Sequence, residues 1–397
     1  MILYQMLKKT ANKYPDKIAI IYNKIATTYQ EFLRQVNHSQ QCLKLFDIYS
    51  DMRIGLILHN SDMYCITLYA LSKNNNITCL MNPLWNEDEI ERKLRIARLD
   101  VTIVEDYIWK VIKEKKPELC NEIRFITRTQ LQEMMKNTSV KNEDECCEVS
   151  EKDLWRKELI QSSSGTTGCS KMAYRTQRNL LYDARNIVFT FQYDSSDIVY
   201  CPVSICHGYG LTMGLIAPVM CGATIVIERV FRCKYFLNHY DKIKPTIFLG
   251  IPENYEEMCT YLEGKKFDFL YRKWFFCSGA PIKRETCEAF FEIANFWINQ
   301  VLGMMEVSTI CANLSPTRDN FLSVGTPVLN VDVKLDRCKK NRYPSIFVKS
   351  ETVSTEYIVD RKDVPIEFYN GWFHTKDIGD INEKGEIFVE GRVGEDK

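Results

Sequence analysis

The stretch Ser162-Ser-Ser-Gly-Thr-Thr-Gly-Cys-Ser-Lys171 carries the strongest signal in the sequence. Its two glycines let the backbone turn tightly and approach a ligand closely. Its hydroxyls and backbone N–H groups can donate hydrogen bonds to phosphate oxygens, and Lys171 adds a positive charge. The apolar segment Leu159–Ser162 precedes the stretch, and a segment with helical spacing, Asn179–Phe191, follows it. Composition and position together predict a phosphate-binding loop between a strand and a helix.

The details of this loop argue against a P-loop kinase or NTPase. The Walker motif has a Gly directly before its Lys and a Ser or Thr directly after it. Here Lys171 is preceded by Ser170 and followed by Met172. A β-rich pattern at the C-terminal end of the chain also disfavours that class.

Short apolar segments alternate with longer amphipathic ones through most of the chain. At one helix start, Thr28-Tyr-Gln-Glu31 fits a capping box. Alternation of this kind predicts parallel strands with helices on the sheet faces. The strands expected here are Ile18–Tyr22, Ile54–Leu58, Val101–Val104, Arg124–Thr127, Ile198–Cys201, Thr224–Ile227, Thr246–Gly250 and Lys273–Cys277.

After about Gly325 the pattern changes to short strands and turns. The strands expected in this part are Val331–Leu335, Ser345–Lys349, Tyr357–Val359 and Glu386–Glu390. The charged stretch Met134–Asp153 is interpreted as an exposed connection between lobes. The sequence therefore predicts an α/β protein with two helix-flanked, mostly parallel sheets and a small C-terminal β-barrel-like subdomain.

Composition restricts the class of protein. The 397 residues include 52 basic and 52 acidic side chains, so the net charge is zero and no nucleic-acid partner is expected. The 16 cysteines are scattered without a CxxC pair, which favours free thiols in a reducing cytoplasm over zinc or disulfides. The N-terminus lacks signal-peptide character. The uncharged run Leu211–Ile227 contains Gly and Pro, so it is predicted to be a buried helix, a turn and a strand rather than a membrane span.

The loop resembles the signature of the adenylate-forming superfamily, Ser/Thr-Ser-Gly-Thr-Thr-Gly-x-Pro-Lys. This superfamily comprises acyl- and aryl-CoA synthetases, peptide-synthetase adenylation domains and firefly-type luciferases. The match covers Ser163–Lys171, with Ser170 in place of proline. The resemblance implies that the phosphates of ATP are bound by Ser163, Ser164, Gly165, Thr166, Thr167, Gly168 and Lys171.

Further motifs of the superfamily follow in the expected order. Pro202-Val-Ser-Ile-Cys-His-Gly-Tyr-Gly210 resembles the segment that places a His beside the acyl pocket, which implies that role for His207. Without the other motifs, a buried His in a turn would be the preferred interpretation. Ser278-Gly-Ala-Pro281 resembles the turn that approaches adenine, with Gly279, Ala280 and Pro281 against the base.

Leu302-Gly-Met-Met-Glu306 resembles Tyr-Gly-x-Thr-Glu, in which the Glu holds the Mg²⁺ that accompanies ATP. The resemblance implies nucleotide contacts for Leu302, Gly303, Met304 and Met305 as well as this metal role for Glu306. Two residues depart from the pattern: Leu302 replaces an adenine-stacking aromatic residue, and Met305 replaces a Thr that contacts the α-phosphate. Loss of one such hydrogen bond weakens binding by about 1 kcal/mol or more.

The last motifs lie near the C-terminus. Ser323-Val-Gly-Thr-Pro327 resembles the turn that enters the β subdomain. Gly371-Trp-Phe-His-Thr-Lys-Asp377 resembles Gly-Trp-x-x-Thr-Gly-Asp, which implies that Asp377 accepts the ribose hydroxyls. Lys376 stands where the superfamily has Gly and is unfavourable if the position requires a positive φ. Arg392 matches the arginine at the domain boundary, expected to contact ribose or phosphate, and Gly394 occupies the hinge position.

The resemblance extends from about residue 10 to the end of the chain. It implies an AMP-binding large domain, 1–391, with lobes at about 1–150, 151–322 and 323–391. Residues 392–397 would begin the hinge, and the C-terminal lid domain is expected to be absent. Three explanations stay open: a shortened chain, a lid supplied in trans, and a chain that no longer catalyses.

The resemblance also implies a function. An acid:AMP ligase joins ATP and a carboxylic acid as an acyl-adenylate, for transfer to CoA or a carrier-protein thiol. Residues expected to act in catalysis are Lys171, His207 and Glu306. No carboxylate lies near His207 to pair with an amino group, so an acyl or aryl acid is favoured over an amino acid. The alternative is a catalytically impaired ATP- or adenylate-binding protein of the same fold, acting as a scaffold or needing a lid in trans.

Overall fold

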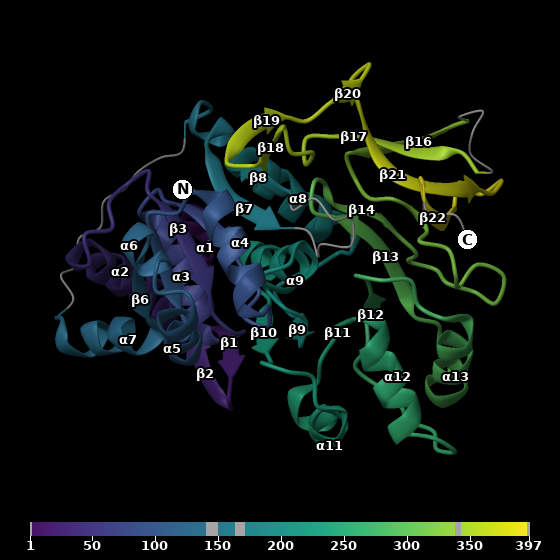
Figure 1. The fold of residues 1–397 in the computed structure, drawn as a ribbon. Helices are drawn as coiled ribbons and strands as arrows, with labels where there is room; N and C mark the ends of the chain where they lie inside the picture. The colour runs from purple at the N-terminus through teal and green to yellow at the C-terminus, as the bar shows by residue number, and fades with distance from the viewer. Residues whose placement is uncertain (1, 140–149, 163–170, 338–342, 395–397) are drawn as a thin grey trace.

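The computed structural model describes residues 2–139, 150–162, 171–337 and 343–394. Two large sheets and a smaller antiparallel sheet organise these residues (Figure 1). The first large sheet has nine strands, of which the six central neighbours run parallel and the outer strands antiparallel. In spatial order the strands are β15 (Thr326–Pro327), β14 (Ser308–Ala312), β13 (Asn299–Met304), β12 (Trp274–Cys277), β11 (Ile247–Gly250), β9 (Ile198–Cys201), β10 (Thr224–Ile227), β1 (Ile18–Tyr22) and β2 (Ile25–Thr28).

The second large sheet has eight strands. Its parallel part runs from β7 to β6, and an antiparallel part is added at β8. In spatial order the strands are β19 (Lys362–Pro365), β18 (Glu356–Val359), β8 (Met172–Thr176), β7 (Lys157–Ser162), β4 (Ile77–Leu80), β3 (Arg53–Ile57), β5 (Val101–Val104) and β6 (Arg124–Thr127).

Helices fill the space between the large sheets and cover their outer faces. Helix α3 is buried at ten of its positions, which is typical of a helix packed on all sides. A single apolar core joins α1, α2, α3, α8 and α10 to strands of both sheets. The helices are α1 (Ile2–Lys13), α2 (Tyr29–Leu45), α3 (Asp62–Lys73), α4 (Glu87–Ala97), α5 (Asp106–Lys115), α6 (Leu119–Glu122), α7 (Arg128–Asn137), η1 (Asp153–Trp155), α8 (Gln177–Thr190), α9 (Gly208–Leu211), the π-helix η2 (Thr212–Ile216), α10 (Ala217–Cys221), α11 (Cys233–Ile243), α12 (Pro252–Tyr261) and α13 (Arg284–Ala294).

The smaller sheet lies at the C-terminal end and is antiparallel. Its strands are β16 (Val331–Asp336), β17 (Ser345–Ser350), β21 (Trp372–Ile381), β20 (Phe368–Tyr369) and β22 (Ile387–Arg392). Two helix-flanked sheets and a curled antiparallel sheet confirm the predicted fold class.

Several local predictions are also confirmed. The Thr28 side chain accepts from the backbone N–H of Glu31, and the Glu31 carboxylate accepts from that of Thr28, so the capping box forms. The run Leu211–Ile227 is divided into short helices, a left-handed Gly222 and strand β10. None of the helices in the described ranges has the length and apolarity needed to cross a membrane.

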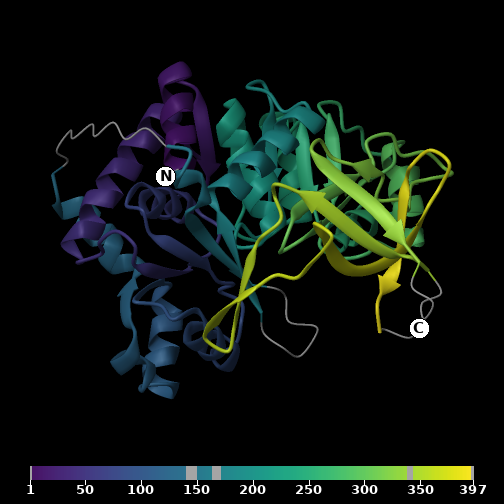
Figure 2. The same cartoon turned by 90° about the horizontal axis from the view of Figure 1, so that it is seen from above.

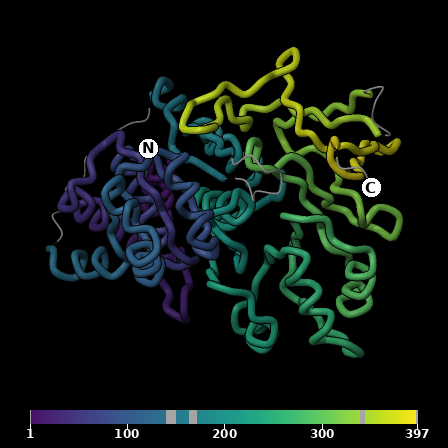
Figure 3. Tube along the Cα trace, in the orientation of Figure 1, coloured from purple at the N-terminus to yellow at the C-terminus, as the bar shows by residue number. Residues whose placement is uncertain are grey.

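Strand β18 is where the sequence-based prediction of the fold was wrong. Its residues were assigned to the C-terminal β region, but β18 pairs with β8 at the edge of the second large sheet, with Tyr357 opposite Ala173. Figures 2 and 3 show the hairpin of β18 and β19 crossing from the C-terminal sheet to that edge and returning. Ile358, fully buried in the core of the second sheet, supplies the driving force.

The surroundings of the predicted phosphate loop also differ from the prediction. Strand β8, rather than a helix, follows Lys171, and its partner β7 runs antiparallel to it with Ser162 opposite Met172. The loop therefore connects two adjacent strands. In addition, α7 runs to Asn137, so the predicted exposed connection Met134–Asp153 begins as helix.

A group of charged and polar side chains ties the hairpin to the second sheet. Asp363 of β19 accepts a hydrogen bond from the Tyr174 hydroxyl at 3.1 Å and pairs with Lys157 at 3.4 Å and with Arg98. Lys157 also pairs with Glu356 of β18 at 2.7 Å. Charged side chains of this kind also protect a sheet edge from further strand pairing.

The two large sheets are also joined through Asn60, which precedes α3. Its Nδ2 donates to the carbonyl oxygens of Val203 at 2.8 Å and Glu228 at 3.1 Å, and its Oδ1 accepts from the Ile205 N–H at 2.9 Å. These partners follow β9 and β10, so one side chain holds the ends of two strands in the other sheet.

We predict that Asn60→Ala lowers the free energy of unfolding by about 3 kcal/mol, because three hydrogen bonds to backbone groups are lost. Urea titration followed by circular dichroism measures the change. Asn121→Ala, at an exposed position of α6, is the control and should change stability by less than about 0.5 kcal/mol. A loss of under 1 kcal/mol for Asn60→Ala would contradict this role for Asn60.

Candidate functional site

The candidate site lies at the carboxyl ends of β9, β11, β12 and β13. These strands are neighbours and run parallel, so the segments that follow them emerge at one edge of the sheet. The segments are 202–207 after β9, 278–281 after β12 and 305–307 after β13. Open α/β sheets bind ligands at this edge. Three of the segments recognised in the sequence therefore emerge at the same edge of this sheet.

Lys171 and Glu306 both contact Tyr357. The Tyr357 hydroxyl donates to Oε1 of Glu306 at 2.7 Å. The Lys171 ammonium lies over the Tyr357 ring, 4.8 Å from its centroid, in a cation–π contact. Burial, followed by the nearby Glu306 carboxylate, raises the pKa of Tyr357, so the phenol stays protonated and can donate. The structure thus brings together the predicted phosphate-binding cation and the predicted metal-binding carboxylate.

The turn that carries Glu306 is held by hydrogen bonds to its backbone carbonyls. The Ser354 N–H donates to the Glu306 carbonyl at 2.7 Å, and Nη1 of Arg175 reaches the Met305 carbonyl at 3.4 Å. Arg175 is fully buried and pairs with Asp183 of α8 at 3.7 Å. Arg175 thus connects α8 to the turn through one ion pair and one hydrogen bond.

Burial raises the pKa of Asp183 to about 6, and Arg175 opposes this shift. Hydroxyls of Ser308 and Thr212 lie beside the same carboxylate and also act to lower its pKa. These two hydroxyls are 3.1 Å apart, which links strand β14 to the π-helix η2. The carboxylate therefore lies where α8, η2 and β14 meet.

The predicted nucleotide-contact residues around β13 are placed as follows. Leu302, Met304 and Met305 are half-buried, while Gly303 is exposed. A Cβ at Gly303 would lie 2.7 Å from the Ser308 carbonyl oxygen, because β13 and β14 have a register shift at this point. This glycine is required by the close approach of the two strands. The Met305 side chain supplies no hydrogen-bond donor.

The predicted adenine turn is exposed at the end of β12. Gly279 has a φ of 93°, a conformation that favours glycine. Ser278 anchors the turn by donating its hydroxyl to the Val301 carbonyl at 2.9 Å. Ala280 and Pro281 follow with exposed side chains. The surface left by these small residues is compatible with a flat base.

His207 caps the short helix α9 at the end of the segment after β9. Its Nε2 lies 3.4 Å from Nδ2 of Asn82, which follows β4 of the second sheet. Interaction with the adjacent Cys206 raises the pKa of His207, while burial opposes this rise. His207 is thus in contact with a residue that follows β4 of the second large sheet, and its place beside an acyl pocket stays a prediction.

Asp377 and Arg392 form a pair on neighbouring strands of the C-terminal sheet. Nε of Arg392 donates to Oδ1 of Asp377 at 3.0 Å, and the two residues are directly opposite in the β21–β22 register. Lys376 has a φ of 68° and is exposed. The position therefore does require the left-handed conformation that the sequence comparison with Gly suggested.

Part of the predicted site lies outside the described residues: Ser163, Ser164, Gly165, Thr166, Thr167 and Gly168. The sequence analysis also missed several residues around it. Tyr357, Arg175 and Asp183 belong to no recognised motif. Lys93 was missed as well: its buried ammonium lies 2.5 Å from the Ser162 hydroxyl, and burial lowers its pKa. The feature that distinguishes Lys93 is the burial of its cation, and this burial cannot be read from the sequence.

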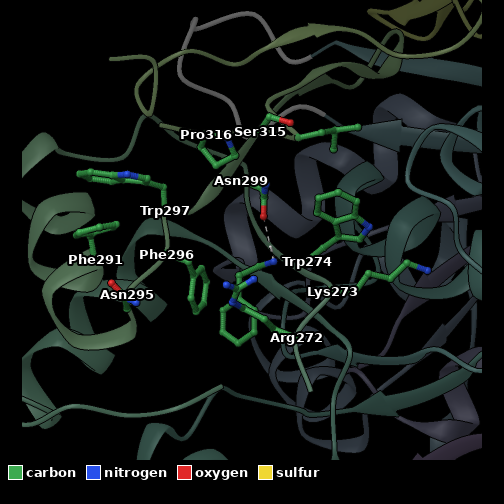
Figure 4. Close-up of a pocket in the computed structure, with 12 residues that line it drawn as sticks. Arg272, Lys273, Trp274, Phe291, Asn295, Phe296, Trp297, Asn299, Ser315 and Pro316 are labelled. Atoms are coloured by element: carbon green, nitrogen blue, oxygen red, sulfur yellow. Dashed lines mark hydrogen bonds between the residues drawn. The ribbon is translucent and has the colours of Figure 1, made fainter. Parts of the chain in front are cut away.

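A separate cavity of about 370 Å³ lies at the amino ends of β12 and β13, on the opposite edge of the sheet (Figure 4). Two of its polar side chains already have partners: the Arg272 guanidinium lies 3.9 Å from the Phe296 ring centroid, and Asn299 accepts from the Phe275 N–H at 3.3 Å. Trp297 stacks on Phe291. This cavity contains none of the predicted site residues, so it is not the candidate site.

We predict that Lys376→Gly keeps the free energy of unfolding unchanged or raises it by up to about 1 kcal/mol, because glycine adopts a positive φ without strain. Lys376→Val should lower it by about 1–2 kcal/mol, since a β-branched residue is unfavourable there. Thermal unfolding of the two variants side by side measures the difference. Equal destabilisation by Gly and Val would contradict the left-handed assignment.

We also predict a pH-dependent effect of Asp183→Asn. From about pH 4 to about pH 6 the folded chain retains a proton on Asp183 that an unfolded aspartate, with a pKa of about 3.9, has lost. The contribution of this group to stability therefore falls as the pH rises. Asn does not titrate, so the stability of the variant relative to the wild type should rise across this range. Urea titrations at several pH values measure the trend, and a flat difference would refute it.

Comparisons with known proteins agree with this geometry. The sequence pattern of the AMP-binding enzyme family matches residues 7–358. A long-chain-fatty-acid–CoA ligase of Bacillus subtilis (strain 168) is 23% identical over 428 residues, covering 98% of this chain and 76% of the relative. The 4-coumarate–CoA ligase 3 of Oryza sativa subsp. japonica is 24% identical over 363 residues, covering 85% of this chain. This chain spans 64% of the rice enzyme's length.

Solved structures of low sequence identity share the fold. The N-terminal domain of FACL13 from Mycobacterium tuberculosis has a TM-score of 0.86 at 20% identity, covering 98% of this chain and 99% of that one. The long-chain-fatty-acid-CoA ligase FadD1 from Archaeoglobus fulgidus has a TM-score of 0.85, also at 20% identity, with 99% and 84% covered. The relatives are named as CoA ligases, which supports the class of an ATP-dependent, AMP-forming ligase. The chain belongs to the AMP-binding enzyme family, within the adenylate-forming superfamily.

Proposed function

We propose that this chain binds ATP and an acyl or aryl carboxylic acid and joins them as an acyl-adenylate. The observation that carries the proposal is the meeting of Lys171 and Glu306 at Tyr357, beside the segments that follow β9, β12 and β13. A cation for phosphate and a carboxylate for a metal ion lie together at the edge of the sheet where ligands bind.

The residues present fit Mg²⁺ as the ion that accompanies ATP. Magnesium in nucleotide sites is held by one or two carboxylates together with phosphate oxygens. Glu306 offers one carboxylate, already oriented by Tyr357. In the described ranges no cluster of three or more His, Cys, Asp or Glu residues forms a metal site made by protein alone. When bound, the ion would neutralise charge on the phosphates.

The proposed reaction has two steps. A carboxylate oxygen of the acid attacks the α-phosphorus of ATP, the bond to the β-phosphate oxygen breaks, and pyrophosphate leaves. A thiol then attacks the acyl carbon and AMP leaves. Lys171 would bind the departing phosphates, Asp377 would accept hydrogen bonds from the ribose, and His207 would border the acid. CoA is the proposed acceptor, because the relatives are named as CoA ligases; a carrier-protein thiol is the alternative acceptor.

The proposed acid is aliphatic or aromatic. The sequence segment 202–210 around His207 includes Ser204 and Cys206, whose side chains are 3.0 Å apart, and contains no Asp or Glu to pair with an amino group. Relatives named for long-chain fatty acids, 4-coumarate and 2-succinylbenzoate support the same classes. A panel of such acids is therefore the appropriate set of substrates.

A second candidate is an ATP- or adenylate-binding protein with impaired catalysis. It is favoured by Met305, which cannot donate the hydrogen bond that a Thr would give to the α-phosphate. Leu302 can pack against a base but does not stack as an aromatic ring would. A lid domain supplied in trans is a further possibility under this proposal.

The test is ATP–pyrophosphate exchange across the acid panel, with and without a separately supplied C-terminal domain from a CoA ligase. We expect acid-dependent exchange, and at least a tenfold lower rate for Glu306→Gln and for Asp377→Asn, because a charged hydrogen-bond or metal contact is worth about 1.5–3 kcal/mol. Calorimetry of ATP binding accompanies each assay.

Matched controls are Glu367→Gln and Asp380→Asn, exposed carboxylates of the C-terminal region outside the candidate site. Both should leave exchange unchanged. ATP binding without exchange would favour the second candidate, and exchange gained by Met305→Thr would identify the missing hydroxyl as the cause. Neither exchange nor ATP binding under any condition would exclude the proposed function.

A further inference from the structure

Tyr357 is the one described residue seen to contact both Lys171 and Glu306. Its hydroxyl donates a hydrogen bond to the Glu306 carboxylate at 2.7 Å, and the centroid of its ring lies 4.8 Å from the Lys171 ammonium. In the proposed function, Lys171 binds the negatively charged phosphates and Glu306 binds the positively charged metal ion. A single side chain therefore lies between the cation and the anion of the site.

The position of Tyr357 is set by the sheet and not by the ligand. Its strand pairs with β8 on one side, where Tyr357 is opposite Ala173, and with β19 on the other, where it is opposite Val364. The ion pair between Glu356 and Lys157, at 2.7 Å, holds the same strand. Both flanking strands fix the backbone of Tyr357. Its phenol is therefore held in place for Lys171 and Glu306 without any rearrangement of the strand.

The contacts made by Tyr357 are weak enough to be replaced. A cation–π contact at a partly exposed site and a single hydrogen bond each contribute little enough that contacts with a bound ligand can replace them. Without the phenol, the ammonium and the carboxylate that both contact Tyr357 would attract each other directly. A direct ion pair would have to be broken before a phosphate and a metal ion could bind.

We propose that Tyr357 is a positioning residue that keeps Lys171 and Glu306 apart and orients the Glu306 carboxylate for the metal ion of a bound nucleotide. Its hydroxyl donates to Oε1 and so limits the orientations that the Glu306 carboxylate can adopt. Its ring holds the Lys171 ammonium in place until phosphate oxygens replace it. This inference rests on the proposed function, since it assigns Tyr357 a role in the same nucleotide site.

The test separates the hydroxyl from the ring. Tyr357→Phe keeps the ring and removes the donor, so affinity for ATP measured by calorimetry with Mg²⁺ should fall about five- to tenfold. Affinity measured in the presence of a chelator should stay within twofold. Tyr357→Leu also removes the ring, so Lys171 and Glu306 can pair, and affinity should fall both with and without Mg²⁺.

Tyr369→Phe is the matched control, because Tyr369 also donates to a glutamate, Glu367, at 3.4 Å but lies on exposed β20. It should bind ATP as the wild type does. Equal affinities for Tyr357→Phe and wild type, or equal losses with and without Mg²⁺, would overturn the inference while leaving the proposed function intact. A wild-type chain that binds no ATP would overturn both.

Discussion

The pairing of β18 with β8 is the interaction on which the geometry of the site depends. It joins residues 356–359, from the C-terminal part of the chain, to residues 172–176 at the edge of the second large sheet. The same strand β8 begins directly after Lys171, and the same strand β18 carries Tyr357. One antiparallel ladder therefore fixes the distance between the predicted phosphate-binding loop and the C-terminal region. These strands are far apart in the sequence, so their pairing closes a long loop, which costs conformational entropy.

The second feature is the use of buried charge beneath the site. Arg175 and Asp183 lie under the turn of Glu306, and Lys93 lies beside Ser162 at the start of the loop. Charged groups in the interior destabilise a protein unless they are compensated by partners. Arg175 contacts Asp183 and the Met305 carbonyl, and Lys93 contacts Glu89 and the Ser162 hydroxyl. These contacts link the buried charges to the turn of Glu306 and to the start of the loop.

The sequence allowed prediction of features that depend on neighbouring residues. Alternating apolar segments identified most strands, Thr28 and Glu31 identified a helix start, and the Gly equivalence at Lys376 identified a positive φ that the structure confirms. Pairing between distant strands was not predictable in this way, because β18 has the same local pattern as the strands that follow it. Tyr357, Arg175 and Lys93 were missed for the same reason. A tyrosine or a basic residue carries no information about its partner until the fold brings the two together.

The departures from the superfamily pattern affect side chains and leave the backbone of the site intact. Gly303 still allows β13 and β14 to approach closely, Gly279 still adopts its positive φ, and the turn of Glu306 is held by Arg175 and Ser354. Loss of one hydroxyl at Met305 would remove about 1 kcal/mol from the proposed nucleotide site, which is about a fivefold change in affinity. A change of that size weakens a site without abolishing it. The geometry thus favours a nucleotide site with reduced affinity over a fold that has lost it.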